Sequence, residues 1–502
     1  MALEIITPEL GNQFVDKAGI TPNGEFTYPV DDEITAGDLV NLIDQHRHRF
    51  RSKYERDRLY YKGDHKVLHQ APKPSYKPDN RVVYNFPRKA VTTFNGYFIG
   101  NPISIDARKD KAADTFVSDW TKEVDFDAVA SDVSKMASIY GHAYLLVYQS
   151  VAELNQTPEP RVAAVDPLNA FIIYDDTLEK RVKYGVTYRK NYKGQLEITL
   201  YDDKMKRDLL MTSSAQYLDQ VRVTANPYGM VPLIEVDENS ERMALCEDIV
   251  TLIDQLDKAM SNKANDNDYF ADAILKIIGP KIDKDTYKDM RNNRMLNIQG
   301  SEASKAQAEF MGKPDNDTSQ EHLVDRLVNS IYEIANVTNL NDDAFNGNPS
   351  GVSLKLKYQS MDNMARQKTL RFKRALRDMF KAVFAVSYMK VSADAWKELE
   401  FTFTRTIPVN FLEEAQALSY ASGKISNRTL FGQLSFVDDP DEELKQMKKE
   451  QQDAMTAANN TVQTAMLGAQ TDQQKKVGGS DDNSEAGAEA DKPTSQPGQQ
   501  NK

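Results

Sequence analysis

Strand-type and helix-type patterns occupy separate blocks of this 502-residue chain, and this segregation is the strongest constraint on its fold. Between Ala143 and about Val236, β-branched and aromatic runs are punctuated by Gly, Pro and Asp. The runs are AYLLVYQ, AFIIYDD, KYGVTYRKNYKGQLEITLYDD and VPLIEV. Helical periodicity dominates on both sides of this block. The sequence therefore predicts an α+β fold that is rich in helices.

The segment before the strands begins with residues 1–35, which lack clear periodicity and are expected to form a loosely ordered arm. A helical pattern then runs from Thr35 to Gly63, where glycine is a typical stop. Leu39, Leu42 and Ile43 form an apolar face at the start of this helix. Between Ile43 and Gly63 the helix carries seven Lys or Arg residues and three acidic residues. His46 and His48 are two residues apart and would diverge on a helix, so both are expected at the solvated surface.

Two further helices are predicted between Gly63 and the strands. One carries Ala90, Val91 and Phe94 and leads through a Gly-Asn-Pro turn into a strand, and the other covers roughly Phe126 to Tyr140. A Pro-rich extended connector, residues 70–80, precedes them.

Three longer helical patterns follow the strands. Apolar residues recur at helical spacing after Ser240, in the stripe Ile249, Leu252, Ile253, Leu256 and Met260. A second stripe begins near Thr318 and contains Leu323, Leu327, Ile331 and Ile334. Between them lies a small α/β insert with expected strands at 273–279 and 294–300. A long helix is then predicted from Ser353 to about Val391, and its first part, up to Lys381, holds nine Lys/Arg against two acids.

The chain ends with a strand, LEFTFTRTIP, two or three short helices between about 411 and 453, and a tail from 454 to 502. The tail has no aromatic residue and is dominated by small and polar residues, so it is expected to be largely disordered.

Composition restricts the function. A net charge of −12 argues against a protein whose main task is to clamp DNA, because Lys and Arg supply most nonspecific DNA affinity. The same charge allows a conduit through which a polyanion slides. Neither an export signal nor an apolar run of 18 residues is present, and the single Cys246 is expected to be a free thiol.

The signatures of common enzymes are missing. The chain has no P-loop. The nearest sequences, Met311-Gly312-Lys313 and Ser422-Gly423-Lys424, are not followed by the Ser or Thr that a P-loop requires after its Gly-Lys pair. It has no His-Glu-x-x-His, Cys-x-x-Cys or Gly-x-Ser-x-Gly either. Two oxygen-rich groups could in principle bind a metal ion. Asn339, Asn341 and Asp343 are interpreted as a polar loop, and Asp266, Asp268 and Asp272 as the solvated end of a helix. No catalytic residue, metal or cofactor is therefore expected.

Eight segments, in order along about 400 residues, resemble the portal proteins of siphophages that infect Gram-positive bacteria. They are YYKGDHKVL (60–68), NRVVYNFPRKAVTTFNGYFIGNPISI (80–105), SIYGHAYLLVY (138–148), IYDDTLEK (173–180), ANDNDYFADAILKIIG (264–279), NPSGVSLKLKY (348–358), FTFTRTIPVN (401–410) and FVDDPDEEL (436–444). Each segment alone is a weak signal, but their serial order is specific. The arm and the tail are not covered.

The resemblance implies a dodecameric ring built from wing, stem, clip and crown regions. Laid onto this chain, it implies the following division: an arm (1–35), the wing (36–239), a first stem helix (240–263), the clip (264–317), a second stem helix (318–338), a tunnel loop (339–352), a long wing helix with its strand (353–410), the crown (411–453) and the tail (454–502).

The same resemblance places DNA contacts at the tunnel loop. Short uncharged side chains suit brief, sequence-independent phosphate contacts, and nearby lysines add attraction. The candidates are Asn341, Asn346, Asn348, Ser350, Lys355 and Lys357. Two roles remain open for Arg371, Arg374 and Arg377 of the long helix: pairing with acids of a neighbouring subunit, or contact with DNA.

A portal would have several partners and no membrane. The expected partners are further copies of the chain, double-stranded DNA, a terminase packaging motor, major capsid and scaffolding proteins, and head–tail connector proteins. The expected location is the portal vertex of the virion, after assembly in the host cytoplasm. Two alternative functions remain. A phage DNA-processing enzyme would need motifs that the sequence lacks, and an acidic helical scaffold or adaptor protein of phage assembly would leave the ordered segments unexplained.

Overall fold

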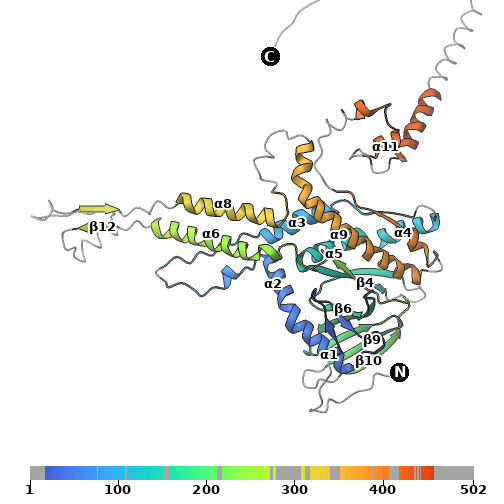
Figure 1. Cartoon of the computed structure of the whole chain (residues 1–502), viewed down its shortest axis with the longest axis horizontal. Coiled ribbons are helices and arrows are strands. Elements are labelled where there is room, and N and C mark those ends of the chain that lie inside the picture. The colour runs from blue at the N-terminus through green and yellow to red at the C-terminus, as the bar shows by residue number, and fades with distance from the viewer. Residues whose placement is uncertain are drawn as a thin grey trace, which may run out of the picture. The chain divides into compact units, whose positions relative to one another are not determined.

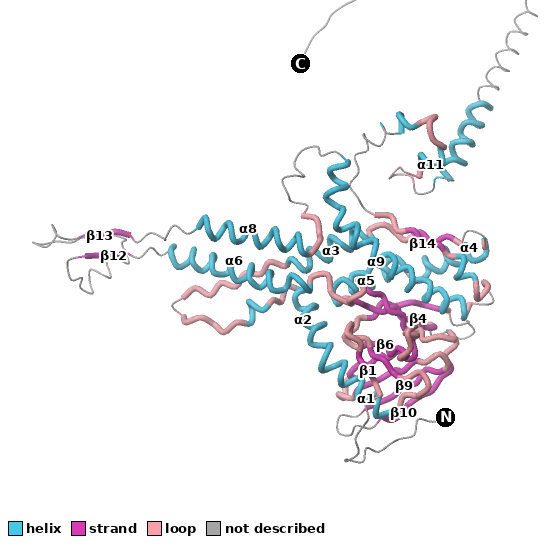
Figure 2. Tube along the Cα trace, viewed as in Figure 1, coloured by secondary structure: helices cyan, strands magenta, loops and turns pink. Residues whose placement is uncertain are grey.

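The computed structural model describes residues 17–271, 275–278, 307–310, 317–339, 351–387, 390–405 and most of 416–456, with short gaps at 76, 108–109, 151–158 and 212–217. The chain divides into two compact units, Met1–Pro408 and Val409–Lys502. Figure 1 labels the helices and strands, and Figure 2 colours them by type.

A seven-stranded sheet forms one part of the first unit (Figure 1). Its strands lie in the order β1 (Gly19–Ile20), β2 (Phe26–Tyr28), β6 (Ala170–Asp175), β7 (Val182–Lys190), β8 (Leu196–Tyr201), β9 (Met205–Met211) and β10 (Leu218–Ala225). β2 runs parallel to β6, and the other neighbours are antiparallel. The predictions at β6, β7 and β8 are confirmed, whereas β9 and β10, in which charged residues interrupt the apolar positions, were not among the predicted runs.

A second sheet of three antiparallel strands, in the order β11 (Leu233–Asp237), β4 (His142–Gln149) and β5 (Pro160–Val165), contacts α5 (Phe126–Tyr140). The largest apolar core joins this sheet to several helices, among them α3 (Phe86–Ile99), α4 (Lys111–Glu123) and α5. α5 ends at Gly141, whose φ is +93°, and a Cβ there would lie 2.1 Å from the carbonyl oxygen of Arg242. Glycine is therefore required where α5 turns into β4. The predicted helices at 86–99 and 126–140 are confirmed.

The basic segment 36–62 is one helical rod with a π-turn in its middle. α1 (Ala36–Gln45) passes through the π-helical η1 (His46–Phe50) into α2 (Arg51–Lys62), which ends at Gly63 as predicted. α1 packs in the core of the seven-stranded sheet, whereas Tyr54 and Tyr60 of α2 belong to the larger core. A π-turn adds residues to one turn and so rotates the helix face. The turn therefore lies where the helix passes from one core to the other.

The surface position expected for His46 is wrong. Its side chain is 2% exposed, stacks on Phe171 with ring centroids 4.9 Å apart, and lies with Nδ1 2.7 Å from the hydroxyl of Tyr188. Burial lowers the pKa of His46 to about 3, so the imidazole stays neutral. His48 is exposed, as predicted.

The expectation of a loose arm over residues 1–35 is wrong from Lys17 onward. β1 and β2 join the seven-stranded sheet, and the rings of Phe26 and Tyr28 are 2% and 1% exposed. These strands are only two and three residues long, so alternation could not reveal them in the sequence. Residues 1–16 lie outside the described part.

Two helices of the first unit run side by side (Figure 1): α6 (Val250–Ala271), preceded by the short 3₁₀ helix η3 (Glu247–Ile249), and α8 (Asp317–Ile334). The first begins ten residues later than the predicted start near Ser240 and continues beyond 263. β12 (Leu275–Ile278) confirms one predicted strand of the insert. Its antiparallel partner is β13 (Gln307–Phe310), whereas the expected strand at 294–300 lies outside the described residues.

The long helix α9 spans Gly351–Val386, close to the predicted range but ending five residues earlier. It contacts β11, β4 and β5. After it, β14 (Glu400–Thr402) confirms the predicted strand and pairs with β3 (Ser104–Asp106), about 300 residues away in the sequence. In the second unit, α11 (Asn427–Phe431) and a helical stretch at 442–456 confirm the prediction of short helices. The tail from 457 lies outside the described part.

Phe26→Ala is expected to lower the free energy of unfolding of the first unit by about 3–5 kcal/mol, because it empties a buried site beside Phe171 and Phe50. Val30→Ala is the control, since Val30 is 50% exposed in the same segment. Denaturant unfolding followed by tyrosine fluorescence measures both. Equal stability of the two variants would mean that residues 17–30 do not pack on the sheet.

Candidate nucleic-acid interface

The long helix α9 has one buried and one exposed face. The buried face follows helical spacing through Met361, Ala365, Lys368, Phe372 and Leu376. We define the outer face as Arg366, Leu370, Arg374, Arg377 and Lys381, all exposed and again at spacings of three or four. The basic residues of this helix are therefore divided between two environments.

Lys368 is buried inside the first unit. Its side chain is fully covered, and Nζ lies 2.6 Å from Oε2 of Glu238 in a salt bridge. The ammonium donates to the hydroxyl of Ser138 at 2.8 Å and to the carbonyl oxygen of Ser134 at 3.0 Å. It also lies over the rings of two phenylalanines, Phe94 at 5.2 Å and Phe98 at 5.0 Å. Burial lowers the pKa of Lys368, and Glu238 opposes this shift.

This ion pair fastens α9 to the rest of the first unit. Glu238 follows β11, and Ser134 and Ser138 belong to α5, so a single cation joins three segments that are distant in the sequence. Sequence reasoning grouped Lys368 with the other cations of the helix. Its position within the stripe of Ala365 and Phe372 was the signal that distinguishes it.

Arg405 makes a second attachment to α9. Its guanidinium donates to the carbonyl oxygen of Ala365 at 3.1 Å, the hydroxyl of Thr369 at 2.5 Å and the carbonyl oxygen of Phe98 at 3.3 Å. Because Arg405 closely follows β14, this cation links the strand pair β3–β14 to the helix.

The three arginines proposed for an interface occupy different settings. Arg371 is half-buried, and its Nη1 lies 3.9 Å from Oδ2 of Asp237 in the same chain. Arg374 and Arg377 are exposed, and neither has an ion pair within the described residues. Burial raises the pKa of the neighbouring Asp378, and both arginines oppose this shift. Arg374 and Arg377 are therefore available to an external anion, whereas Arg371 already has an internal carboxylate.

The tunnel-loop candidates mostly fall outside the described residues. Asn341, Asn346, Asn348 and Ser350 lie in the undescribed stretch 340–350, and the side chain of Lys355 is not described either. Lys357 is half-buried near the start of α9. The hydroxyl of Thr338 donates to the carbonyl oxygen of Lys357 at 3.1 Å, so the segments on either side of this stretch are in contact.

The helix α6 carries a row of polar side chains that bind an extended segment. Backbone N–H groups of Tyr84, Val82 and Asn80 donate to Asp257 at 2.7 Å, Ser261 at 2.9 Å and Asn265 at 2.6 Å, respectively. Four residues of helix rise about 6 Å and two extended residues span about 6.6 Å, so the two spacings match. We call these three helix residues the polar ladder.

A buried hydrogen bond extends the polar ladder at one end. Asp257 also lies 2.6 Å from Nδ1 of His65, and both side chains are fully buried. On another side of α6, Lys263 forms a salt bridge with Glu321 of α8. Polar groups therefore hold α6 to the segment 65–84 on one side and to α8 on another.

The predicted apolar stripes are confirmed on α6 and only partly on α8. Ile253 and Leu256 of α6 and Ile249 at the end of η3 are buried, and Leu252 and Met260 are partly buried against the same core. On α8, Ile331 is buried, but Leu323 is 51% and Ile334 46% exposed. Part of the α8 stripe therefore remains uncovered in a single chain.

The metal candidates give no cluster in the part of the chain that the structure describes. Within it, no three His, Cys, Asp or Glu side chains are grouped to hold an ion. Asp268 accepts a hydrogen bond from the side chain of Asn80, and Asp266 is half-buried on α6. Asp272, Asn341 and Asp343 lie outside the described residues. Likewise, none of the described helices combines the length and hydrophobicity that crossing a bilayer requires.

Comparison with known proteins gives the family. The family model described as "Phage portal protein, SPP1 Gp6-like" matches residues 41–457, which is most of the chain. The chain belongs to this phage portal family. The matched range includes the three-stranded sheet, all strands of the seven-stranded sheet except β1 and β2, the helices α6, α8 and α9, and the described helices of the second unit.

Two individual relatives agree with the family model. The portal protein of Clostridium phage phiCD119 is 22% identical over 397 residues, which cover 75% of this chain and 86% of the relative. The portal protein of Bacillus phage SPP1 is 21% identical over 404 residues, which cover 74% of this chain and 76% of the relative.

The expectation of a portal protein is thereby confirmed. Portal proteins are structural proteins of the phage particle, located at a capsid vertex. The chemistry of this chain is accordingly to be sought in surfaces that contact DNA and other proteins, and the outer face of α9 is the described surface with the clearest pattern of exposed cations.

Lys368→Met is expected to lower the free energy of unfolding by about 3–5 kcal/mol, because it leaves the carboxylate of Glu238 buried without a cation. The double variant Lys368→Met/Glu238→Gln should recover most of this loss. Lys373→Met on the same helix is the control, since Lys373 is only half-buried. Urea unfolding measures all three. A loss no larger for Lys368→Met than for Lys373→Met would contradict the role assigned to the buried pair.

Proposed function

We propose that copies of this chain form a closed ring at one capsid vertex, through whose channel double-stranded DNA enters and leaves the capsid. The observation that carries the proposal is the family match over residues 41–457. Twelve subunits are proposed, as the resemblance implies. The same ring would dock the terminase packaging motor, capsid and scaffolding proteins, and head–tail connector proteins, and it would assemble in the host cytoplasm. The role is mechanical and non-enzymatic.

Uncovered apolar side chains support contacts between subunits. Leu323 and Ile334 of α8 are about half-exposed, and Leu356 and Leu370 of α9 are 65% and 72% exposed. Large apolar side chains lying along exposed helix faces favour burial against another protein surface. In a closed ring each such contact recurs at every interface, so modest individual gains add up.

The regions of a portal are assigned as follows. We propose that the two sheets with α1 to α5 form the wing, that α6 and α8 form the stem, and that the segment around β12 and β13 forms the clip, which meets the connector proteins. Residues 339–352, the last two of which begin α9, would be the tunnel loop, and residues 411–453 the crown. The ordered strands β1 and β2 extend the proposed wing to about residue 17.

α9 fits the role of a rigid support for the tunnel loop. Residues 340–350 lead directly into this 36-residue helix, which Lys368 and Arg405 fasten to the core. A force on the loop would then be transmitted along a helix that is anchored at two points. The cations of the outer face would meet either DNA or acids of the next subunit.

Purification of the full chain tests the ring directly. We expect negative-stain electron microscopy to show uniform rings with a central channel, and light scattering to give the mass of about twelve subunits. A monomer that persists across salt and protein concentrations and also in the presence of capsid scaffolding protein would contradict the proposal, and would favour the scaffold or adaptor hypothesis.

Asn346→Asp/Asn348→Asp tests the tunnel loop. Two added negative charges should repel passing phosphates and reduce the yield of full-length packaged genomes severalfold, while the ring still assembles. Asn459→Asp/Asn460→Asp adds the same charge in the tail, more than 100 residues further along the sequence, and is the matched control. Packaging yield in a complementation assay is the measurement, and equal yields from the two double variants would remove the loop from the DNA path.

A further inference from the structure

A cleft in the first unit lies between the helical rod 36–62 and the region where β7 ends and β8 begins. Its volume is about 440 Å³. It is lined by Arg47, His48, Arg51, Asn169, Tyr188, Arg189, Lys190 and Leu196. None of these residues is acidic, although the whole chain carries a net charge of −12. We call this space the basic cleft.

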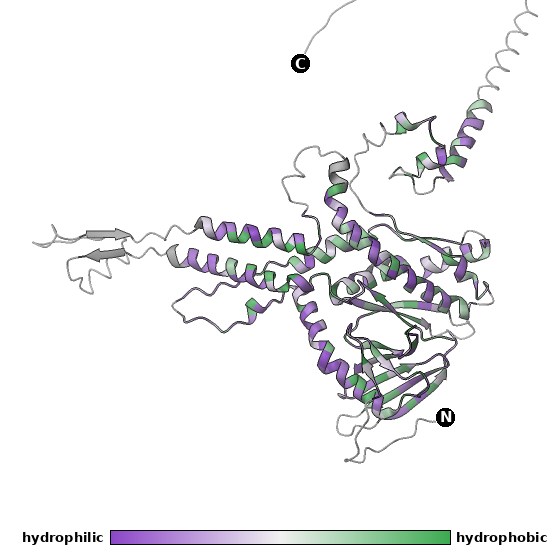
Figure 3. Cartoon of the chain, viewed as in Figure 1, coloured by the Kyte–Doolittle hydropathy of each residue, from purple (hydrophilic) through white to green (hydrophobic). Residues whose placement is uncertain are grey.

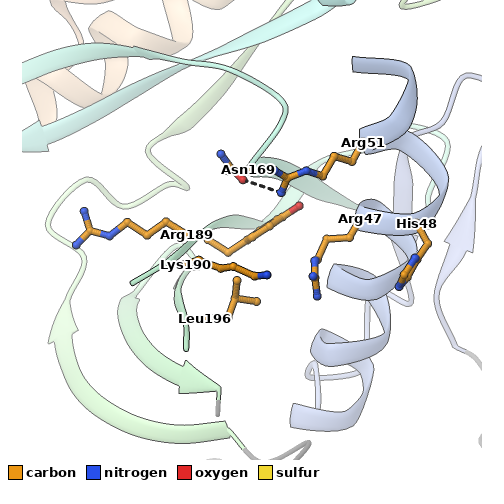
Figure 4. Close-up of a pocket in the computed structure, with 8 residues that line it drawn as sticks. Arg47, His48, Arg51, Asn169, Arg189, Lys190 and Leu196 are labelled. Atoms are coloured by element: carbon orange, nitrogen blue, oxygen red, sulfur yellow. Dashed lines mark hydrogen bonds between the residues drawn. The ribbon is translucent and has the colours of Figure 1, made fainter. Parts of the chain in front are cut away.

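Cations reach the basic cleft from two sides. In Figure 4, Arg47 and Arg51 extend from the helix toward the strands, and the amino group of Lys190 extends from the strand side toward Arg47. Arg189 points away from them. Figure 3 shows α2, the helix that begins at Arg51, mainly in the purple of hydrophilic residues.

The neighbouring carboxylates pair with only part of the positive charge in the basic cleft. Glu55 pairs with Nε of Arg51 at 2.8 Å, and Asp44 lies 3.5 Å from Nη1 of Arg47. Lys190 has no ion pair within the described residues. Since each carboxylate engages only one side of its guanidinium, further nitrogens remain for an anion in the cleft.

The protein scaffold fixes the positions of these cations. Arg47 lies in the π-turn beside the buried His46, whose ring is held by the hydroxyl of Tyr188. That hydroxyl donates to the carbonyl oxygen of Leu168 at 3.2 Å. Nη1 of Arg51 donates to the side chain of Asn169 at 3.3 Å. The turn that moves the helix between the two cores therefore also sets Arg47 and Arg51 against β7.

We propose that the basic cleft binds a phosphate group, either free or in a DNA backbone. A phosphate presents oxygens in several directions and can be contacted from the helix and the strand at once, whereas a carboxylate presents two oxygens along one edge. A volume of about 440 Å³ is within the range of ligand sites and leaves room for the sugars next to a phosphodiester. The inference does not depend on ring formation.

The test is a calorimetric titration of the full chain with three separate ligands at constant ionic strength. The ligands are inorganic phosphate, a short DNA duplex and polyglutamate. Arg47→Gln/Lys190→Gln should weaken phosphate binding at least about tenfold through the loss of two charge-assisted contacts. Arg58→Gln is the matched control, because Arg58 is exposed on α2 and does not line the cleft. An unchanged melting temperature in chloride shows that each variant is folded.

The outcomes separate the sources of the phosphate. A parallel loss of duplex affinity in the double variant supports the site and assigns it to the DNA backbone, whereas unchanged duplex affinity supports the site for a free phosphate. The proposal fails if phosphate binds wild type no better than the double variant, or if Arg58→Gln weakens it as much. It also fails if polyglutamate is the only one of the three ligands whose affinity differs between wild type and the double variant. The cleft would then bind an acidic protein segment.

Discussion

The buried ion pair between Lys368 and Glu238 is the interaction on which the rest of the first unit depends. It joins α9, α5 and the end of β11, and both side chains are buried. Because water cannot replace a lost partner there, the pair is favourable only in its present geometry. A pair of this kind contributes little net free energy compared with apolar packing, but a separated charge there is costly. It therefore fixes the register of α9 against the three-stranded sheet more than it adds stability.

A fixed α9 has consequences at both of its faces. The buried side continues the core through Phe372 and Leu376, and the opposite side presents Arg374 and Arg377 to the surroundings. α6 repeats this division, because its apolar stripe faces the core while the polar ladder binds the extended segment 80–84. In both helices, buried polar groups fix the position of the helix against its neighbours, and apolar groups supply the buried contact area. Such construction suits a portal subunit, which must keep its shape while DNA passes.

Most of the fold could be predicted from periodicity and turn residues, and the failures have physical causes. The apolar strands β4, β6, β7, β8 and β11 and the helices at 86–99 and 126–140 were visible in the sequence. β1 and β2 were too short to be seen, and charged residues interrupt the apolar positions of β9 and β10. His46 and Lys368 were assigned to the surface or to a basic group because polar residues are usually exposed. Their burial depends on Tyr188 and Glu238, partners that are more than 100 residues away and that local patterns cannot reveal. The family followed from ordered segments, and the tunnel-loop residues remain predictions.

A side-chain-resolution electron cryomicroscopy structure of the assembled protein with DNA would test the central claim most directly. We predict subunits around a channel, with residues 340–350 at its narrowest point and Nζ of Lys368 still within hydrogen-bonding distance of Glu238 in every subunit. A structure in which residues 340–350 lie away from the DNA, or in which α9 has left the three-stranded sheet and exposed Lys368, would contradict it.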